Sequence, residues 1–201
     1  MVKKLEKIFD ELNKKQKYII FSVIGTHAGE SRQEIFKRKI EDINKAEYTF
    51  WLFKSNQAKP NIVQDFCKRA KKKNGNVFCV FIGSSTPGGA RPTKINALAE
   101  SYSVDNKKWS ILPEELSSVT GEINKGAYAL IFDSLREVDD EINLWEYADF
   151  LTKKAIKIRL GNSTLCAIRK NTAEEMDKMK SPNRKIIAIA KLHEPYCVWL
   201  K

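Results

Sequence analysis

Three apolar, strand-like runs in the first half of the chain each end in a loop of the same chemical kind. The runs are Tyr18–Ile24, Thr49–Phe53 and Val77–Ile82. Helix-like stretches separate them, so right-handed crossovers would make them parallel strands whose carboxyl ends meet at one edge of a sheet. The loops carry hydroxyls, glycines, a histidine and fixed positive charges, which together suit an anion. The sequence therefore predicts a class of ligand at this edge, but no reaction.

The alternation of helix and strand signals predicts the fold class. An amphipathic stripe over 3–15, a helix from Ser31 to about Lys45 and a helix beginning at Pro60 alternate with the three runs. Glu34, three residues after Ser31, completes a capping-box pattern. We expect an α/β fold in which an N-terminal alternating αβαβαβ unit with a parallel sheet precedes a β-rich, mixed α/β second half in the same domain.

The second half is predicted to be rich in strands. Strands are expected over 127–135, 185–192 and 196–200, and a β-hairpin is expected over 155–169 around a Gly-Asn-Ser turn. A helix is expected over 139–153, where apolar residues recur at helical spacing. The 201 residues suit a single domain over 1–201, and a subdivision into 1–104 and 105–201 is the alternative.

The chain is strongly basic, and its charge is unevenly distributed along the sequence. The formal net charge is +11. Residues 1–94 hold 20 Lys and Arg against 9 Asp and Glu, residues 95–150 hold 4 against 12, and residues 151–201 hold 12 against 4. If the first and last segments share a face, the protein presents a basic surface with an acidic flank. Such a field favours an acidic partner, with solubility alone as the competing explanation.

The loop Gly83–Lys94 is the strongest candidate for an anion site. Glycines let backbone N–H groups approach a phosphate, and cationic side chains neutralise it. The spacing does not match a P-loop, because Ala90-Arg91 follows Gly88-Gly89. A long surface connection with no ligand is the alternative. The candidate ligand-binding residues in this loop are Ser84, Ser85, Thr86, Arg91 and Lys94.

The other two loops supply further candidates. In Gly25–Arg32, His27 is the candidate acid/base and Glu30 its orienting partner, while Ser31 and Arg32 are candidate ligand-binding residues at a helix N-terminus. An ordinary strand–helix turn explains the same residues without a ligand. Lys54 and Lys59, in the loop after the second run, are added as phosphate contacts.

Metal, disulfide and membrane signals are weak. The acids between Asp133 and Glu141 are explained by the start of the expected helix, so no metal site and no cofactor are predicted. Four widely spaced cysteines form no C-x-x-C pair and are interpreted as buried free thiols of a cytoplasmic protein. No apolar run is long enough to span a bilayer, so no membrane partner is expected.

Three functions remain open at this point. The first is the binding of a polyanion, nucleic acid or a nucleotide, by the loops at the carboxyl edge. The second is a hydrolase or transferase that acts on a phosphorylated or ribosylated small molecule, with His27 as acid/base and Ser84–Thr86 with Arg91 as the anion clamp. The third is a protein-interaction module whose basic face meets an acidic partner. Whether the protein is an enzyme is left open.

Overall fold

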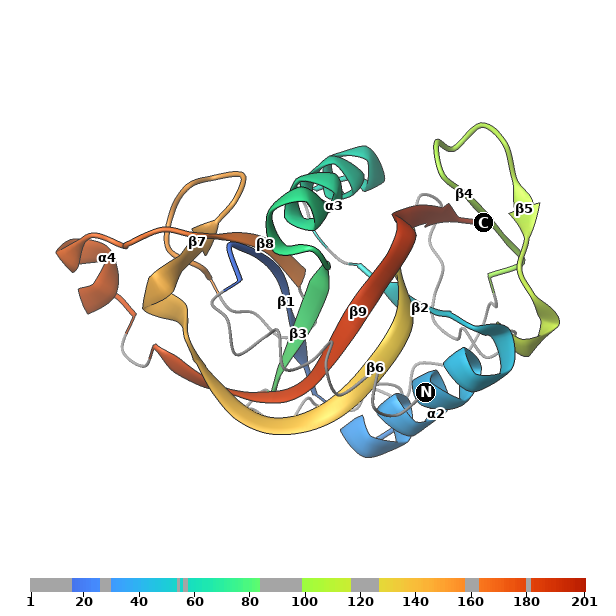
Figure 1. Cartoon of the computed structure of the whole chain (residues 1–201), viewed down its shortest axis with the longest axis horizontal. Helices are drawn as coiled ribbons and strands as arrows, with labels where there is room; N and C mark the ends of the chain where they lie inside the picture. The colour runs from blue at the N-terminus through green and yellow to red at the C-terminus, as the bar shows by residue number, and fades with distance from the viewer. Residues whose placement is uncertain are drawn as a thin grey trace.

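A long, curved ribbon of two antiparallel strands organises this strand-rich α/β protein (Figure 1). The computed structural model describes residues 16–25, 30–53, 55, 58–83, 99–116, 127–157, 163–179 and 182–201. These residues form nine strands of one mixed sheet, in which seven follow the order β2-β6-β9-β3-β1-β8-β7 and the hairpin β4–β5 is attached to β9. The strands are β1 (Tyr18–Ile24), β2 (Thr49–Leu52), β3 (Phe78–Gly83), β4 (Ser101–Ser103), β5 (Ser110–Ile111), β6 (Tyr128–Asn143), β7 (Tyr147–Asp149), β8 (Ser163–Ile168) and β9 (Asn183–Leu200). The helices are α2 (Arg32–Ala46), α3 (Pro60–Asn74), α4 (Ala173–Asp177) and the short 3₁₀ helices η2 (Glu114–Leu116) and η3 (Leu144–Glu146).

One pair of strands in the described part of the chain is parallel. β1 and β3 lie side by side with Ile20 opposite Cys79 and Ile24 opposite Gly83. β2 pairs instead with β6 in antiparallel orientation, and β6 and β9 separate it from β3. The predicted N-terminal αβαβαβ unit with a parallel sheet is therefore wrong. The mixed α/β, strand-rich class is confirmed.

The β6–β9 ribbon replaces two predicted features of the second half. β6 continues to Asn143, opposite Asn183, so the helix predicted over 139–153 is wrong. The two strands predicted over 185–192 and 196–200 are one strand, β9, which carries a bulge between them. In the ladder, Phe132 pairs with Leu192 and Leu130 with Cys197, so several residues of β9 oppose a single residue of β6.

The predicted hairpin over 155–169 is also replaced by longer-range pairing. β8 is antiparallel to β1 on one side and to β7 on the other. Ala155 makes an isolated bridge to Ala148, and residues 158–162 lie outside the described residues. β8 is therefore a central strand of the sheet rather than one arm of a local hairpin.

The two long helices form where their sequence signals predicted them. Ser31 caps α2, and the capping box is complete because the Glu34 backbone N–H donates to the Ser31 hydroxyl and the Ser31 N–H donates to the Glu34 carboxylate. These bonds lower the pKa of Glu34, and the bond from the Ser31 backbone N–H has the largest effect. Pro60 occupies the first turn of α3, and Gly75 ends it with φ of 83°. Both helices are therefore confirmed.

The main core lies between the curved sheet and these helices. Phe36 of α2 and Phe66 of α3 are each 1% exposed. Trp51 of β2 contacts Phe81 of β3 with ring centroids 4.6 Å apart, although two strands, β6 and β9, separate them along the sheet. The sheet is therefore strongly curved. In the described residues, no helix combines the length and apolarity that crossing a membrane requires.

Candidate functional site: a basic edge and hairpin

The carboxyl ends of β1 and β3 meet at one edge of the sheet, and Arg32 lies against that edge. A Cβ built on Gly83 would lie 2.7 Å from Arg32 Nη1 and 3.4 Å from the Ile187 side chain. Glycine at the end of β3 thus leaves the room that the guanidinium occupies. Arg32 is the first residue of α2, so the capped start of that helix positions it. The strands that precede the first and third loops therefore end side by side, while residues 26–29 and 84–98 of those loops lie outside the described residues, so the meeting of the three loops stays a prediction.

Glu30 and Ser31 at the same edge have defined partners. The Glu30 carboxylate receives two hydrogen bonds from Arg38, from Nε at 3.1 Å and from Nη2 at 2.6 Å. The hydroxyl of Ser31 accepts the helix-capping bond of Glu34. Glu30 therefore fixes Arg38 in a bidentate ion pair, and the predicted contact of Glu30 with His27 stays a prediction because His27 lies outside the described residues.

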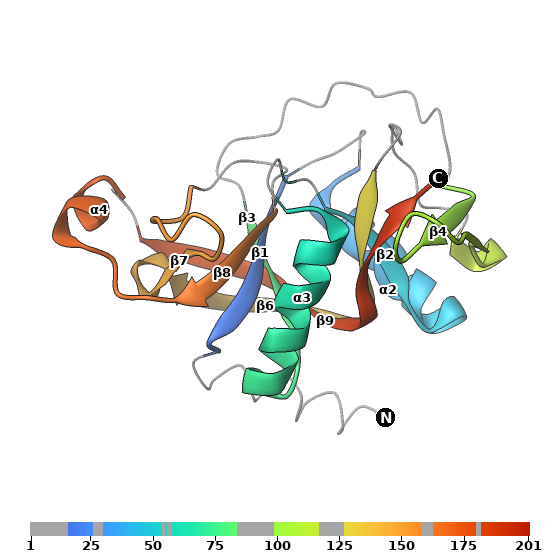
Figure 2. The ribbon, with the colours of Figure 1, turned by 90° about the horizontal axis from the view of Figure 1, so that it is seen from above.

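Lys59 is exposed at the N-cap of α3 and makes no side-chain capping bond. α2 and α3 both begin on the side of the molecule where β1 ends, the upper side in Figure 2. Arg32 and Lys59 therefore belong to one side of the protein. The remaining predicted ligand-binding residues, Lys54, Ser84, Ser85, Thr86, Arg91 and Lys94, lie outside the described residues, so their assignment stays a prediction.

The tip of the β4–β5 hairpin is a tightly built turn that sequence reasoning did not single out. The Asp105 carboxylate accepts the backbone N–H groups of Lys107 at 3.0 Å and Lys108 at 3.4 Å, and the Ser103 hydroxyl at 3.2 Å. Asn106 supplies the left-handed residue, with φ of 63°. These bonds lower the pKa of Asp105, the one from Lys107 most strongly. The turn therefore presents two exposed lysine side chains from a fixed backbone.

α3 holds this hairpin in place. The Gln64 side chain donates to the Val104 carbonyl at 3.1 Å and to the Cys197 carbonyl of β9 at 2.7 Å. Lys68 and Lys71 follow Gln64 by four and seven residues and are exposed on the same side of α3. The cations of the hairpin and of the helix thus form one surface. We define it as the basic surface, comprising Lys68, Lys71, Lys72, Lys107 and Lys108.

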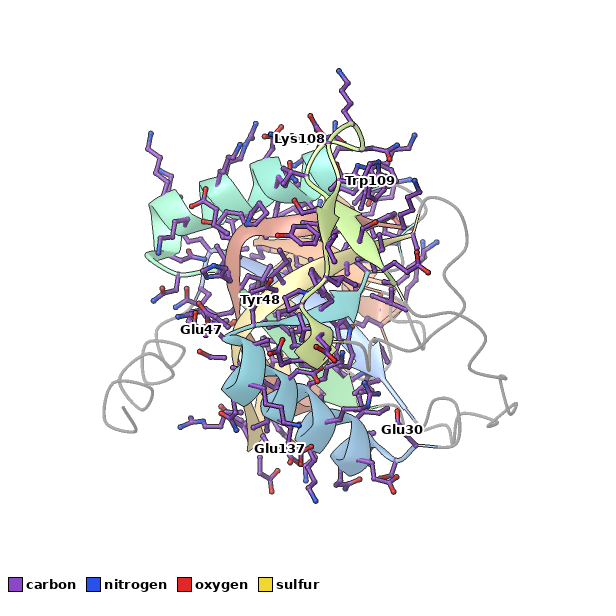
Figure 3. The ribbon with its side chains drawn as sticks, turned by 90° about the vertical axis from the view of Figure 1, so that its right-hand side faces the viewer. Glu30, Glu47, Tyr48, Lys108, Trp109 and Glu137 are labelled. Carbon is purple, nitrogen blue, oxygen red and sulfur yellow. The ribbon has the colours of Figure 1, made fainter. Side chains whose placement is uncertain are left out.

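Acidic side chains gather on the other side of the protein. Figure 3 shows Lys108 at the end of the molecule where α3 lies, and Glu137 of β6 at the opposite end, beyond α2. β6 also exposes Asp139, Asp140 and Glu141. The acids predicted to begin a helix therefore line a strand instead. These acids lie beside cations of β9, because Lys185 Nζ is 2.9 Å from Asp139 Oδ1 and Lys185 stands opposite Glu141 in the ladder. The basic last segment of the chain therefore pairs with the acidic middle segment, and the charge segregation along the sequence is only partly kept in the fold.

A second polar cluster lies beside the β9 bulge, and sequence reasoning missed it. Asp133 Oδ1 is 3.0 Å from Lys191 Nζ, and Asp133 Oδ2 is 3.4 Å from His193 Nδ1. The His193 ring stacks on Tyr48, with centroids 6.4 Å apart and planes 7° from parallel. Lys191 and His193 are two residues apart, so an extended chain places both on one side of the strand. Which acid of β6 they meet is set by the long-range register of the two strands, so the sequence did not reveal Asp133. This cluster links the two strands of the ribbon where the ladder is irregular.

Lys39 of α2 is a buried cation with a structural partner. Its Nζ lies 3.4 Å from Asp42 Oδ2, and the Thr49 hydroxyl of β2 donates to the same oxygen at 2.8 Å. Burial lowers the pKa of Lys39 to about 8, although Asp42 opposes the shift. Lys39 is 5% exposed, and its partner Asp42 joins α2 to β2 through Thr49. Within the described ranges, no group of three or more His, Cys, Asp or Glu side chains has the arrangement to hold a metal ion.

Comparison of the chain with family models, with curated proteins and with solved structures finds no match.

Proposed function

We propose that this protein binds nucleic acid through the basic surface, with Arg32 at the sheet edge as a further phosphate contact. The observation that carries the proposal is the Gln64 bond to the Val104 carbonyl, which joins the hairpin lysines to the lysines of α3. A polyanion has evenly spaced phosphates, so it gains most from cations held at fixed separations. Nucleic acid fits this surface better than a small anion does, because the cations extend along a helix and a hairpin.

The charge balance of α3 supports the proposal. From Lys59 to Asn74 the chain carries Lys59, Lys68, Arg69, Lys71, Lys72 and Lys73 against the single carboxylate of Asp65. The helix dipole accounts for cations in the last turn, where Lys71, Lys72 and Lys73 lie. It does not account for Lys68 or for the lysines of the hairpin. These residues therefore distinguish a binding surface from an ordinary helix end.

The proposal is tested by exchanging lysines in pairs. Lys107→Ala with Lys108→Ala removes two cations of the hairpin, and Lys37→Ala with Lys45→Ala removes two exposed cations of α2. We expect the hairpin pair to weaken the binding of a labelled oligonucleotide roughly tenfold, since charged hydrogen bonds to phosphate contribute about 1.5–3 kcal/mol apiece before solvent screening reduces them. The α2 pair is expected to change the dissociation constant less than threefold. Equal losses in the two variants would mean a diffuse charge effect and would refute the proposed surface.

A further inference from the structure

Trp109 lies on the basic surface immediately beside the two hairpin lysines. It directly follows Lys108 and precedes β5, and its side chain remains partly exposed. Figure 3 shows Trp109 and Lys108 projecting from the hairpin at the end of α3. The Lys201 ammonium lies over the indole, 5.4 Å from its centroid. The indole thus carries the Lys201 ammonium over one face and directly follows two exposed lysines in the chain.

Exposed apolar side chains accompany Trp109. Among the described residues, the large apolar side chains that are most exposed include Ile111 at 87% and Val104 at 44%. Ile111 is two residues after Trp109, so the alternation of an extended chain places both on one side of the strand. Val104 lies on the other limb of the same hairpin but on its opposite face, because Ser101 stands opposite Ile111 and Val104 is three residues further along. The hairpin therefore combines apolar contact area with positive charge, which a phosphate-binding surface alone does not need.

From this combination we infer that the nucleic acid is single-stranded and that one of its bases stacks on Trp109. The inference rests on the proposed function. Unpaired bases expose their faces and stack on aromatic side chains, while cations along the groove hold the phosphates. A duplex keeps its base faces stacked on each other and gains only the phosphate contacts. The Asp105 bonds hold the tip rigid, so little chain entropy is lost when a nucleotide binds.

A protein partner is the competing occupant of this hairpin. An apolar patch of Trp109 and Ile111 would serve such a partner, but the neighbouring Lys107, Lys108 and Lys201 would meet it with charge that must be neutralised. A single strand supplies both the aromatic face and the neutralising phosphates in one repeating unit. The charge therefore favours the nucleic acid.

The test measures fluorescence anisotropy with a labelled twelve-nucleotide single strand and a twelve-base-pair duplex. We expect the wild-type protein to prefer the single strand. Trp109→Ala should weaken single-strand binding by roughly tenfold, the contribution of one stacked base, and leave duplex binding within about twofold. Trp109→Phe, which keeps an aromatic face, should recover most of the loss. Circular dichroism of each variant checks that the fold is retained.

The outcomes separate this inference from the proposed function. If both oligonucleotides bind with equal affinity and Trp109→Ala changes neither, base stacking at Trp109 is overturned while the proposed function stands. If neither oligonucleotide binds at low salt, the proposed function fails and the inference fails with it. Heparin that competes with the single strand equally well in wild type and in Trp109→Ala would also overturn the stacking inference, because heparin has charge but no bases.

Discussion

The Gln64 side chain donates a hydrogen bond to the Val104 carbonyl across 40 residues of sequence. The same amide nitrogen donates to the Cys197 carbonyl, so one side chain of α3 holds both the hairpin tip and β9. This relationship turns two separate groups of lysines into a single surface. Removing these two hydrogen bonds changes the position of the hairpin lysines without changing their charge, so it tests the geometry of the surface by itself.

Replacing Gln64 with Met should therefore weaken oligonucleotide binding without any change in net charge. We expect a loss of several-fold in affinity because the hairpin lysines are no longer held beside α3. The free energy of unfolding should fall by about 1–2 kcal/mol, since two carbonyls lose their donor. Anisotropy and urea unfolding measure the two effects. Gln33→Met, at an exposed position of α2, is the control, and an unchanged affinity in Gln64→Met would contradict the role of this bond.

Gly83→Ala tests whether the sheet edge contributes to binding. The new Cβ would meet the Arg32 guanidinium, which is the far end of a flexible side chain and can move. We expect the melting temperature to change by less than about 3 °C, because no backbone atom is displaced. Oligonucleotide affinity should fall to the same extent as in Arg32→Ala. An affinity in Gly83→Ala that equals wild type, together with a loss in Arg32→Ala, would show that the position of Arg32 at this edge is not required.

The local elements of this fold could be predicted from sequence. The Ser31–Glu34 capping box and Pro60 act within one helical turn, so both helices begin where the pattern indicated. The pairing of β2 could not be predicted, because parallel neighbours are the common outcome of β-α-β order and nothing local specifies an antiparallel partner some 80 residues later. Long-range register decided that part of the fold.

The helix predicted over 139–153 failed for a related reason. Apolar residues there follow helical spacing, but Ile142 pairs with Arg184 in the β6–β9 ladder, and Leu144 turns into the core through η3. A long partner strand outweighed a weak helical propensity. The candidate site could not be predicted either, because it too depends on long-range contacts. Lys107, Lys108 and Trp109 carry no recognisable motif, and only the Asp105 turn and the Gln64 contact reveal that they are held together.

The buried Lys39 predicts a pH dependence of stability. Its pKa is about 8 in the folded protein against an ordinary value of 10.5, so between these values the unfolded chain binds more protons. The contribution of Lys39 to the free energy of unfolding is therefore least favourable below pH 8 and becomes more favourable as the pH rises toward 10.5. Urea unfolding at pH 7 and pH 9.5 should show wild type gaining stability relative to Lys39→Met. Lys37→Met, at an exposed position, should follow wild type, and parallel profiles for wild type and Lys39→Met would contradict the account.

The four cysteines should be inert in the native protein. Cys67, Cys79, Cys166 and Cys197 are all buried free thiols, and burial raises the pKa of each. A thiol reagent such as dithionitrobenzoate should therefore react on the timescale of unfolding in buffer and at once in concentrated guanidinium. A thiol that reacts within seconds in the native protein would show that one of these sites opens locally.

The salt dependence of oligonucleotide binding tests the central claim most directly. For a single strand, the slope of log K against log salt is about −0.7 per phosphate neutralised. We predict a steep negative slope for the wild-type protein, and a slope shallower by about 1.4 for the variant with Lys107→Ala and Lys108→Ala, because two contacts are lost. The variant with Lys37→Ala and Lys45→Ala should keep the wild-type slope. Identical slopes in all three proteins would contradict the assignment of the basic surface as the binding site.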